Sequence, residues 1–187
     1  GAAHVGRDRL ETSEEEQLLT GLVVGTRDFM TKAGHRKALV PLDGVNGAVA
    51  TVIAARALEP RNVLGILVNT SGGQDAVAPA DARALAEKLG IEILTYDAGD
   101  SLGALKATAS KSISPAPQDA AEDHLAGRLS SLLLALAAEK QRAALILTCD
   151  KSDLALGRVG QHGDGVAALA ILGDVPKTIL SRLAEFI

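Results

Sequence analysis

Short, fully apolar runs alternate with amphipathic segments along most of the chain. We predict strands at short segments of five to seven mainly apolar residues, at 37–41, 62–68, 91–96 and 143–148. Runs of this kind are typical of parallel strands buried on both faces. Helical spacing of apolar residues predicts helices over 14–32, 48–58, 79–89, 119–140 and 175–187, with shorter helices early in 98–118 and at 150–157. This alternation favours an α/β fold: a doubly wound, Rossmann-like parallel sheet with helices on both faces.

Capping and breaking residues set the boundaries of these elements. Ser13 with Glu16 three residues later forms a capping-box pattern, so residues 1–12 are predicted to be a tail or linker. Pro60 ends one helix and Pro79 suits the first turn of the next. Ligands of such sheets bind beyond the carboxyl ends of the strands. The segments to inspect are therefore 42–47, 69–78, 97–118, 148–153 and 158–174.

Composition narrows the class of protein. The 187 residues suit one domain, and with 2% aromatic residues the core must be built from Ala, Leu, Val and Ile. A net charge of −4 and the scarcity of aromatic side chains argue against a nucleic-acid partner. One cysteine, Cys149, excludes an internal disulfide. No apolar run reaches the roughly 18 residues of a membrane span, so we expect no membrane partner and a cytoplasmic location.

Two of these loops carry candidate chemistry. In 42–47, Gly44 and Gly47 would let an anion approach backbone N–H groups, although Asp43 would repel it. The alternative is a plain strand-to-helix turn. In 148–153, a hydroxyl and two carboxylates suit a nucleotide with Mg²⁺. The alternative there is that Asp150 is a helix N-cap and Asp153 a first-turn acid.

Several segments, taken together and in order, resemble the synthetase domain of NAD synthases, especially the glutamine-dependent type. The family's typical stretches are "LVLGLRDYVRKNG", "NVxGVLMPS…DAxxLAxxLGI", "LVLTTGNKSE", "YGD" and "DVYKT". Their counterparts here are 22–34, 63–67 with 81–91, 145–153, 163–164 and 174–178, and 39–58 is similar to the pyrophosphate loop with its helix. The near match SGGQDA at 71–76 falls in the family's substrate loop and is interpreted as coincidental.

The resemblance implies an adenine nucleotide alpha hydrolase-like fold that adenylates deamido-NAD with ATP and Mg²⁺, after which ammonia displaces AMP. By this resemblance ATP would be bound by Gly44, Asn46, Gly47, Thr148 and Lys177. Asp164 would bind substrate and Asp153 the Mg²⁺ ion. The implied partners are a second copy in a homodimer and a glutaminase domain or subunit. The apolar run 132–136 also suggests self-association.

The sequence departs from this family pattern at the site itself. The family's S-G-G-x-D-S falls on 42–47, where both hydroxyls are absent, Asp43 replaces a glycine and Asn46 replaces the metal-facing Asp. Its A-R-x-R falls on 126–129, so both substrate-side arginines are missing, and Asp153 stands for a Glu. The family normally continues beyond the position of Ile187, so the domain at 13–187 looks truncated.

These departures leave more than one function open. We expect a weak or inactive homologue with little or no ATP binding, kept as a binding or oligomerisation domain. The alternative is active ATP-dependent amidation of deamido-NAD to NAD, with ammonia supplied directly or from glutamine. A nucleotide-sensing domain of the same fold is a third class.

Overall fold

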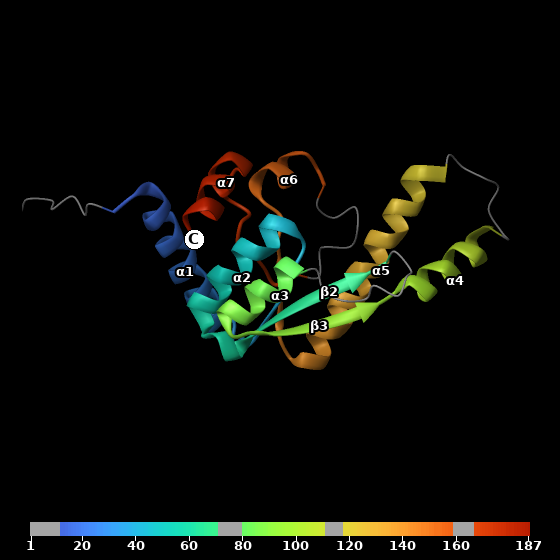
Figure 1. The fold of residues 1–187 in the computed structure, drawn as a ribbon, viewed down its shortest axis with the longest axis horizontal. Coiled ribbons are helices and arrows are strands. Elements are labelled where there is room, and N and C mark those ends of the chain that lie inside the picture. Colours follow the sequence, from blue (N-terminus) through green and yellow to red (C-terminus); the bar gives the residue numbers. More distant parts are fainter. Residues whose placement is uncertain (1–11, 71–79, 111–117, 159–166) are drawn as a thin grey trace, which may run out of the picture.

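A computed structural model describes residues 12–70, 80–110, 118–158 and 167–187 of the chain. Its elements follow the predicted strand–helix alternation (Figure 1). In chain order they are α1 (Glu14–Lys32), β1 (Ala38–Pro41), α2 (Gly44–Leu58), η1 (Pro60–Asn62), β2 (Val63–Asn69), α3 (Ala80–Leu89), β3 (Glu92–Asp97), α4 (Gly99–Ser110), α5 (Gln118–Gln141), β4 (Ala144–Leu147), α6 (Lys151–Ala155), β5 (Leu169–Ala170) and α7 (Lys177–Phe186).

The strands form one parallel sheet in the order β3-β2-β1-β4-β5. The four predicted strands therefore lie side by side and parallel, as expected from their apolar content. Strand order runs from β1 to β3 in one direction and from β1 to β4 in the other, so the switch point lies between β1 and β4. A ligand of this class of sheet is expected just beyond the ends of those two strands.

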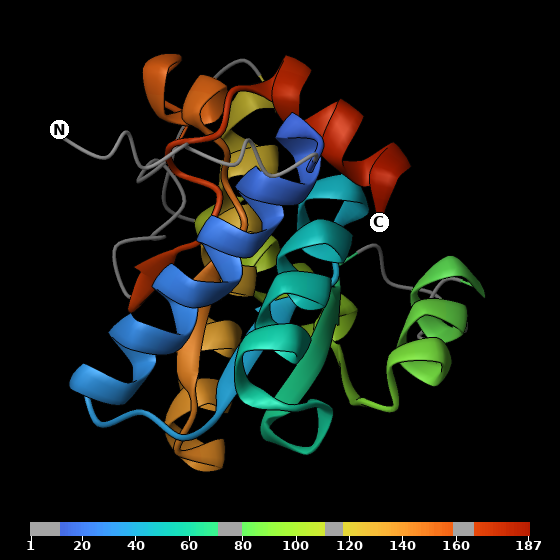
Figure 2. The same ribbon diagram turned by 90° about the vertical axis from the view of Figure 1, so that its left-hand side faces the viewer.

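Helices cover both faces of the sheet because successive strand residues point to opposite sides. Ala38 and Val40 join one core cluster with residues of α1, α2 and α7, whereas Leu39 between them joins another with α5. Figure 2 shows α1, α2 and α7 in front of the strands and α5 behind them. The predicted doubly wound arrangement is thus confirmed. Within the described ranges, no helix has the length and apolarity needed to cross a membrane.

Two element boundaries differ from the sequence prediction in ways that affect the site. The helix predicted from residue 48 already begins at Gly44, so most of the predicted turn 42–47 is the first turn of α2. Gly44 has φ +62, a conformation that favours glycine, and its presence made a helix start look like a loop. β5 is the second difference: it lies in the predicted glycine-rich loop and pairs with β4 through two residues only.

Some predicted features lie outside the described residues. They are the tail up to residue 11, the SGGQDA match, residues 111–117 of the segment 97–118 and Asp164. The predicted N-cap of α1 lies within the description and is confirmed, because Ser13 Oγ accepts a hydrogen bond from the Glu16 amide.

Gly47 is the glycine on which the start of α2 most depends. A Cβ placed there would overlap the carbonyl oxygen of Pro41 and lie 2.8 Å from Asp43 Oδ1. By contrast, Gly21 in α1 has no atom within 4 Å of a built Cβ. The backbones of β1 and α2 can approach this closely only without a side chain at 47.

We predict that Gly47→Ala destabilises the domain by roughly 1–3 kcal/mol, because the new methyl group meets backbone that cannot yield cheaply. Gly21→Ala is the matched control and should stabilise by about 0.5–1 kcal/mol, since it only improves helix propensity. Urea denaturation of both variants measures the two effects. Equal effects of the two substitutions would contradict the close-packing argument.

Candidate active site at the switch point

A pocket of about 580 Å³ opens beyond the ends of β1 and β4. Its walls come from the start of α2, the segment after β4, the start of α7 and the middle of α5. The polar lining residues are Asp43, Asn46, Ser130, Ser131, Thr148, Asp153, Arg158, Lys177 and Ser181. The pocket therefore occupies the position that the strand order predicts for a ligand.

The junction between β1 and α2 contains a buried apolar side chain, Leu42, followed by a charged one, Asp43. Leu42 is buried, and its Cδ1 would lie only 2.6 Å from a Cβ at Gly65 of β2. Asp43 is the N-cap residue of α2 but forms no side-chain cap. Its carboxylate instead accepts a hydrogen bond from Thr148 Oγ1 at 3.1 Å. A negative charge therefore lies in the pocket wall next to the end of β4.

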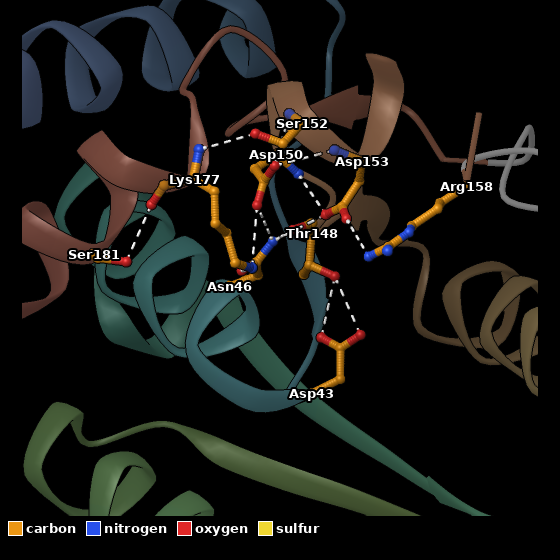
Figure 3. A network of polar contacts seen from close by, with 9 residues as sticks. All are labelled: Asp43, Asn46, Thr148, Asp150, Ser152, Asp153, Arg158, Lys177 and Ser181. Atoms are coloured by element: carbon orange, nitrogen blue, oxygen red, sulfur yellow. Dashed lines mark hydrogen bonds and ion pairs between the residues drawn. The ribbon is translucent and has the colours of Figure 1, made fainter. Parts of the chain in front are cut away.

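Asn46 links three segments that are far apart in the chain (Figure 3). Its Nδ2 donates to the carbonyl oxygen of Thr148 at 2.9 Å and to Asp150 Oδ2 at 3.2 Å. Its Oδ1 accepts from Lys177 Nζ at 2.7 Å, and the same ammonium lies 3.2 Å from Asp150 Oδ2. The starts of α2, α6 and α7 are thus tied together by one amide, one carboxylate and one ammonium group.

Asp150 is the buried member of this network, with a side chain 0% exposed. Its Oδ1 accepts from the amides of Ser152 (2.8 Å) and Asp153 (3.1 Å), which caps α6 and completes a capping box with Asp153. Burial by itself raises the pKa of Asp150, but hydrogen bonds from Asn46, the backbone and Lys177 outweigh it and hold the pKa below the ordinary value of an aspartate. The N-cap alternative is confirmed, and the carboxylate also orders its neighbours.

Asp153 has the surroundings of a cap residue. Its Oδ2 accepts from the Asp150 amide at 3.2 Å and from Asn46 at 3.4 Å, while Oδ1 lies 3.8 Å from the exposed Arg158. Among the residues that the structure describes, no three His, Cys, Asp or Glu side chains are grouped to hold a metal ion. The side chains around Asp153 therefore do not fit a Mg²⁺ ion held by the protein alone. The assignment of Asp153 to Mg²⁺ stays a prediction.

The structure brings most of the predicted site residues together. Asn46 is hydrogen-bonded to both Thr148 and Lys177, and Gly44 lines the same pocket. Gly47 does not line it; this glycine is buried against β1 and lets the helix start there. Arg158, Ser130 and Ser131 also line the pocket and were missed. The serines directly follow the A-R-x-R position (126–129) on the same helix, which is the signal that could have identified them.

We predict that Asp150→Asn costs roughly 1–3 kcal/mol at pH 7, because Lys177 loses its buried carboxylate while the cap of α6 survives. A depressed pKa in the folded state stabilises above the unfolded pKa, and this gain is lost as pH falls through the folded pKa. The stability difference between wild type and variant should therefore be constant down to about pH 5 and shrink below about pH 4. Urea denaturation across this pH range tests it; a constant difference throughout would contradict it.

Comparison with known proteins places these features in a family. A family model described as NAD synthase matches residues 18–187. The glutamine-dependent NAD(+) synthetase of Synechocystis is 35% identical over 93% of this chain and 31% of its own length. The NH(3)-dependent enzyme of Methanosarcina mazei is 32% identical over 85% of this chain and 62% of its own. The chain spans about a third of the length of the glutamine-dependent relatives.

A solved structure agrees with the sequence relatives. The glutamine-dependent NAD+ synthetase of Acinetobacter baumannii, in complex with ADP, superposes with a TM-score of 0.85 and 27% identity, covering 94% of this chain and 33% of that one. The sequence match over most of the chain and the shared parallel sheet lead to the same assignment. The chain belongs to the NAD synthase family.

Proposed function

We propose that the chain is the synthetase portion of an NAD synthetase and that the pocket binds ATP for the amidation of deamido-NAD. The observation that carries this proposal is the position of the pocket. It lies at the β1–β4 switch point and is lined by residues 43–46, which belong to the segment that resembles the family's nucleotide loop, together with Thr148 and Lys177. The related structure from Acinetobacter baumannii is a complex with ADP.

The proposed reaction proceeds in two balanced steps. The carboxylate of deamido-NAD attacks the α-phosphorus of ATP and releases pyrophosphate, and ammonia then displaces AMP to form the amide with loss of a proton. The ammonium of Lys177 and the N–H groups at the start of α2 would face the phosphate charges. Several relatives are named glutamine-dependent, so we propose a glutaminase domain or subunit as the ammonia source. With a single cysteine, the chain suits a reducing compartment such as the cytoplasm.

One observation favours a second function, a domain that keeps the fold without the chemistry. Asp43 places a carboxylate beside Thr148 where phosphates would approach, and Asn46 and Lys177 bind to Asp150 rather than to the open pocket. This is the reading that the sequence departures suggested. In this case the chain would bind a partner or assemble while lacking ATP-dependent turnover.

Titration with ATP, with and without MgCl₂, distinguishes the two functions when it is combined with an amidation assay. We expect ATP to raise the melting temperature, and deamido-NAD with ammonium to yield NAD and AMP in equal amounts by chromatography. Binding and turnover that are both absent in the full-length protein would establish the non-catalytic function instead.

Asp43 gives a direct electrostatic prediction. We expect Asp43→Asn to tighten ATP binding, because two like charges at 4 Å cost about 4 kcal/mol at an effective dielectric of 20. Asp43 is exposed, so solvent screening reduces the expected gain to about 10–100-fold. The gain should shrink as salt is raised. Glu87→Gln, which removes one charge from exposed α3, is the control; an equal gain there would show that only net charge matters.

We also propose that the domain self-associates through α5. Leu132 and Leu136, one turn apart, are 66% and 41% exposed, whereas Leu129 on the same helix is buried in the core. Such an apolar strip on a helix is commonly covered by another surface. A second copy of this chain is the occupant we propose.

Sedimentation at micromolar concentration should therefore show a dimer, and Leu132→Glu should shift it towards monomer by placing a charge in the interface. Val24→Glu changes a similarly exposed apolar residue on α1 and serves as the control. A wild-type monomer, or equal dissociation by both variants, would contradict the α5 interface.

A further inference from the structure

Position 46 is surrounded by hydrogen-bond acceptors on the side that faces α6. Asn46 Nδ2 lies 2.9 Å from the Thr148 carbonyl oxygen, 3.2 Å from Asp150 Oδ2 and 3.4 Å from Asp153 Oδ2. A carboxylate at 46 would therefore face a carbonyl oxygen and two carboxylates without a proton between them. Since Asp150 is fully buried, that repulsion would be poorly screened.

Lys177 can reach a carboxylate at either of two positions. Its Nζ lies 2.7 Å from Asn46 Oδ1 and 3.2 Å from Asp150 Oδ2. The other oxygen of Asp150 serves only as an acceptor for the amides of Ser152 and Asp153. The carbonyl oxygen of an asparagine could do the same, because Asn and Asp are equally good N-caps. Lys177 could thus be paired with a carboxylate at either position 46 or position 150, provided that the other position carries an amide. With the carboxylate at 46, the Thr148 carbonyl oxygen and Asp153 Oδ2 would still face it, so the exchange restores only part of the network.

We propose that Asp150 is a positioning residue of the nucleotide site, and that positions 46 and 150 form an exchangeable carboxylate–amide pair. In this chain the carboxylate is at the buried position, where it holds the Lys177 ammonium and the Asn46 amide. The amide is at the position that lines the pocket. The inference rests on the proposed function only in calling the pocket a nucleotide site; the exchange itself is a property of the folded chain.

A double-mutant cycle tests the exchange through the stability of the full chain at pH 7. We expect Asn46→Asp alone to lower the melting temperature by roughly 6 °C or more, and Asp150→Asn alone to lower it by a few degrees. Combined, the two should recover at least half of the loss caused by Asn46→Asp. Asp150→Asn would thus destabilise the wild type but stabilise the Asn46→Asp variant.

The control separates this exchange from general charge relief. Glu87→Gln makes the same change in net charge on exposed α3 and should recover nothing in the Asn46→Asp background. If Asn46→Asp does not fold, recovery of a folded protein by Asp150→Asn supports the proposal, and failure to recover overturns it. Additive effects in the cycle also overturn it.

A second readout reports on Lys177 itself. The Nζ resonance of Lys177, assigned with Lys177→Arg, should move in Asp150→Asn and return towards its wild-type position in the exchanged variant, where position 46 supplies the carboxylate. A role of Asp150 limited to capping α6 would leave this resonance unmoved, and that result would overturn the positioning role.

ATP titration of the same four proteins keeps the two proposals distinguishable. The exchanged variant carries its carboxylate on the pocket wall. The ratio of its ATP affinities with and without Mg²⁺ should therefore be at least tenfold larger than the same ratio in the wild type. Absence of ATP binding in all four proteins would count against the proposed function, while the stability cycle and the Lys177 resonance would still decide the exchange.

Discussion

The buried carboxylate of Asp150 is the constraint on which the geometry of this domain depends. A charge removed from water persists only when donors surround it. Here the donors come from three segments: the backbone of α6, the amide of Asn46 in α2 and the ammonium of Lys177 in α7. The carboxylate therefore fixes the starts of these helices relative to one another, and because all three lie beyond β1 and β4, it also fixes the floor of the pocket.

The contacts around Asp150 also occupy several of the polar groups at the pocket. The side chain of Lys177 is 56% exposed, but its ammonium group already contacts the side-chain oxygens of Asn46 and Asp150. The amide of Asn46 is similarly used within the protein. Thr148 donates to Asp43. The polar groups that a phosphate would be expected to meet are thus already engaged with one another, so a nucleotide must compete with internal hydrogen bonds as well as with water.

The fold could be predicted from the sequence because its signals are local. Fully apolar runs such as 62–68 are interpretable without tertiary information, and the parallel topology follows from the helices between them. The β5 pairing could not be predicted, because two residues such as Leu169 and Ala170 carry no periodicity. The start of α2 was placed four residues late, because Gly44 with φ +62 suggests a turn. The close packing of Gly47 against β1, which marks the helix start, involves tertiary contacts that the sequence does not show.

The site was predictable in its position but not in its hydrogen bonds. Sheet topology brings residues after β1 and β4 together, and three residues that the family resemblance predicts for the site, Asn46, Thr148 and Lys177, line the same pocket. The main partners of Asn46 lie more than 100 residues away in sequence, at Thr148 and Asp150. An Asn in place of an Asp looked like a loss from the sequence alone. Next to a buried Asp150 the same residue is a requirement, since only a donor satisfies the acceptors around it.

The replacement of an Asp by Asn46 therefore does not by itself show that the domain has lost nucleotide binding. Asn46, Thr148, Asp150 and Lys177 are hydrogen-bonded to one another and to Asp43 within the protein, so these contacts contribute to stability whether or not a nucleotide binds. A site of this kind can lose affinity for phosphates while its stability is unaffected, because the same contacts that hold the helices together take up the groups that would bind them. For the proposed nucleotide site, we therefore expect phosphate affinity to depend on the charges of the pocket wall, Asp43 against Lys177 and Arg158, and not only on an intact fold.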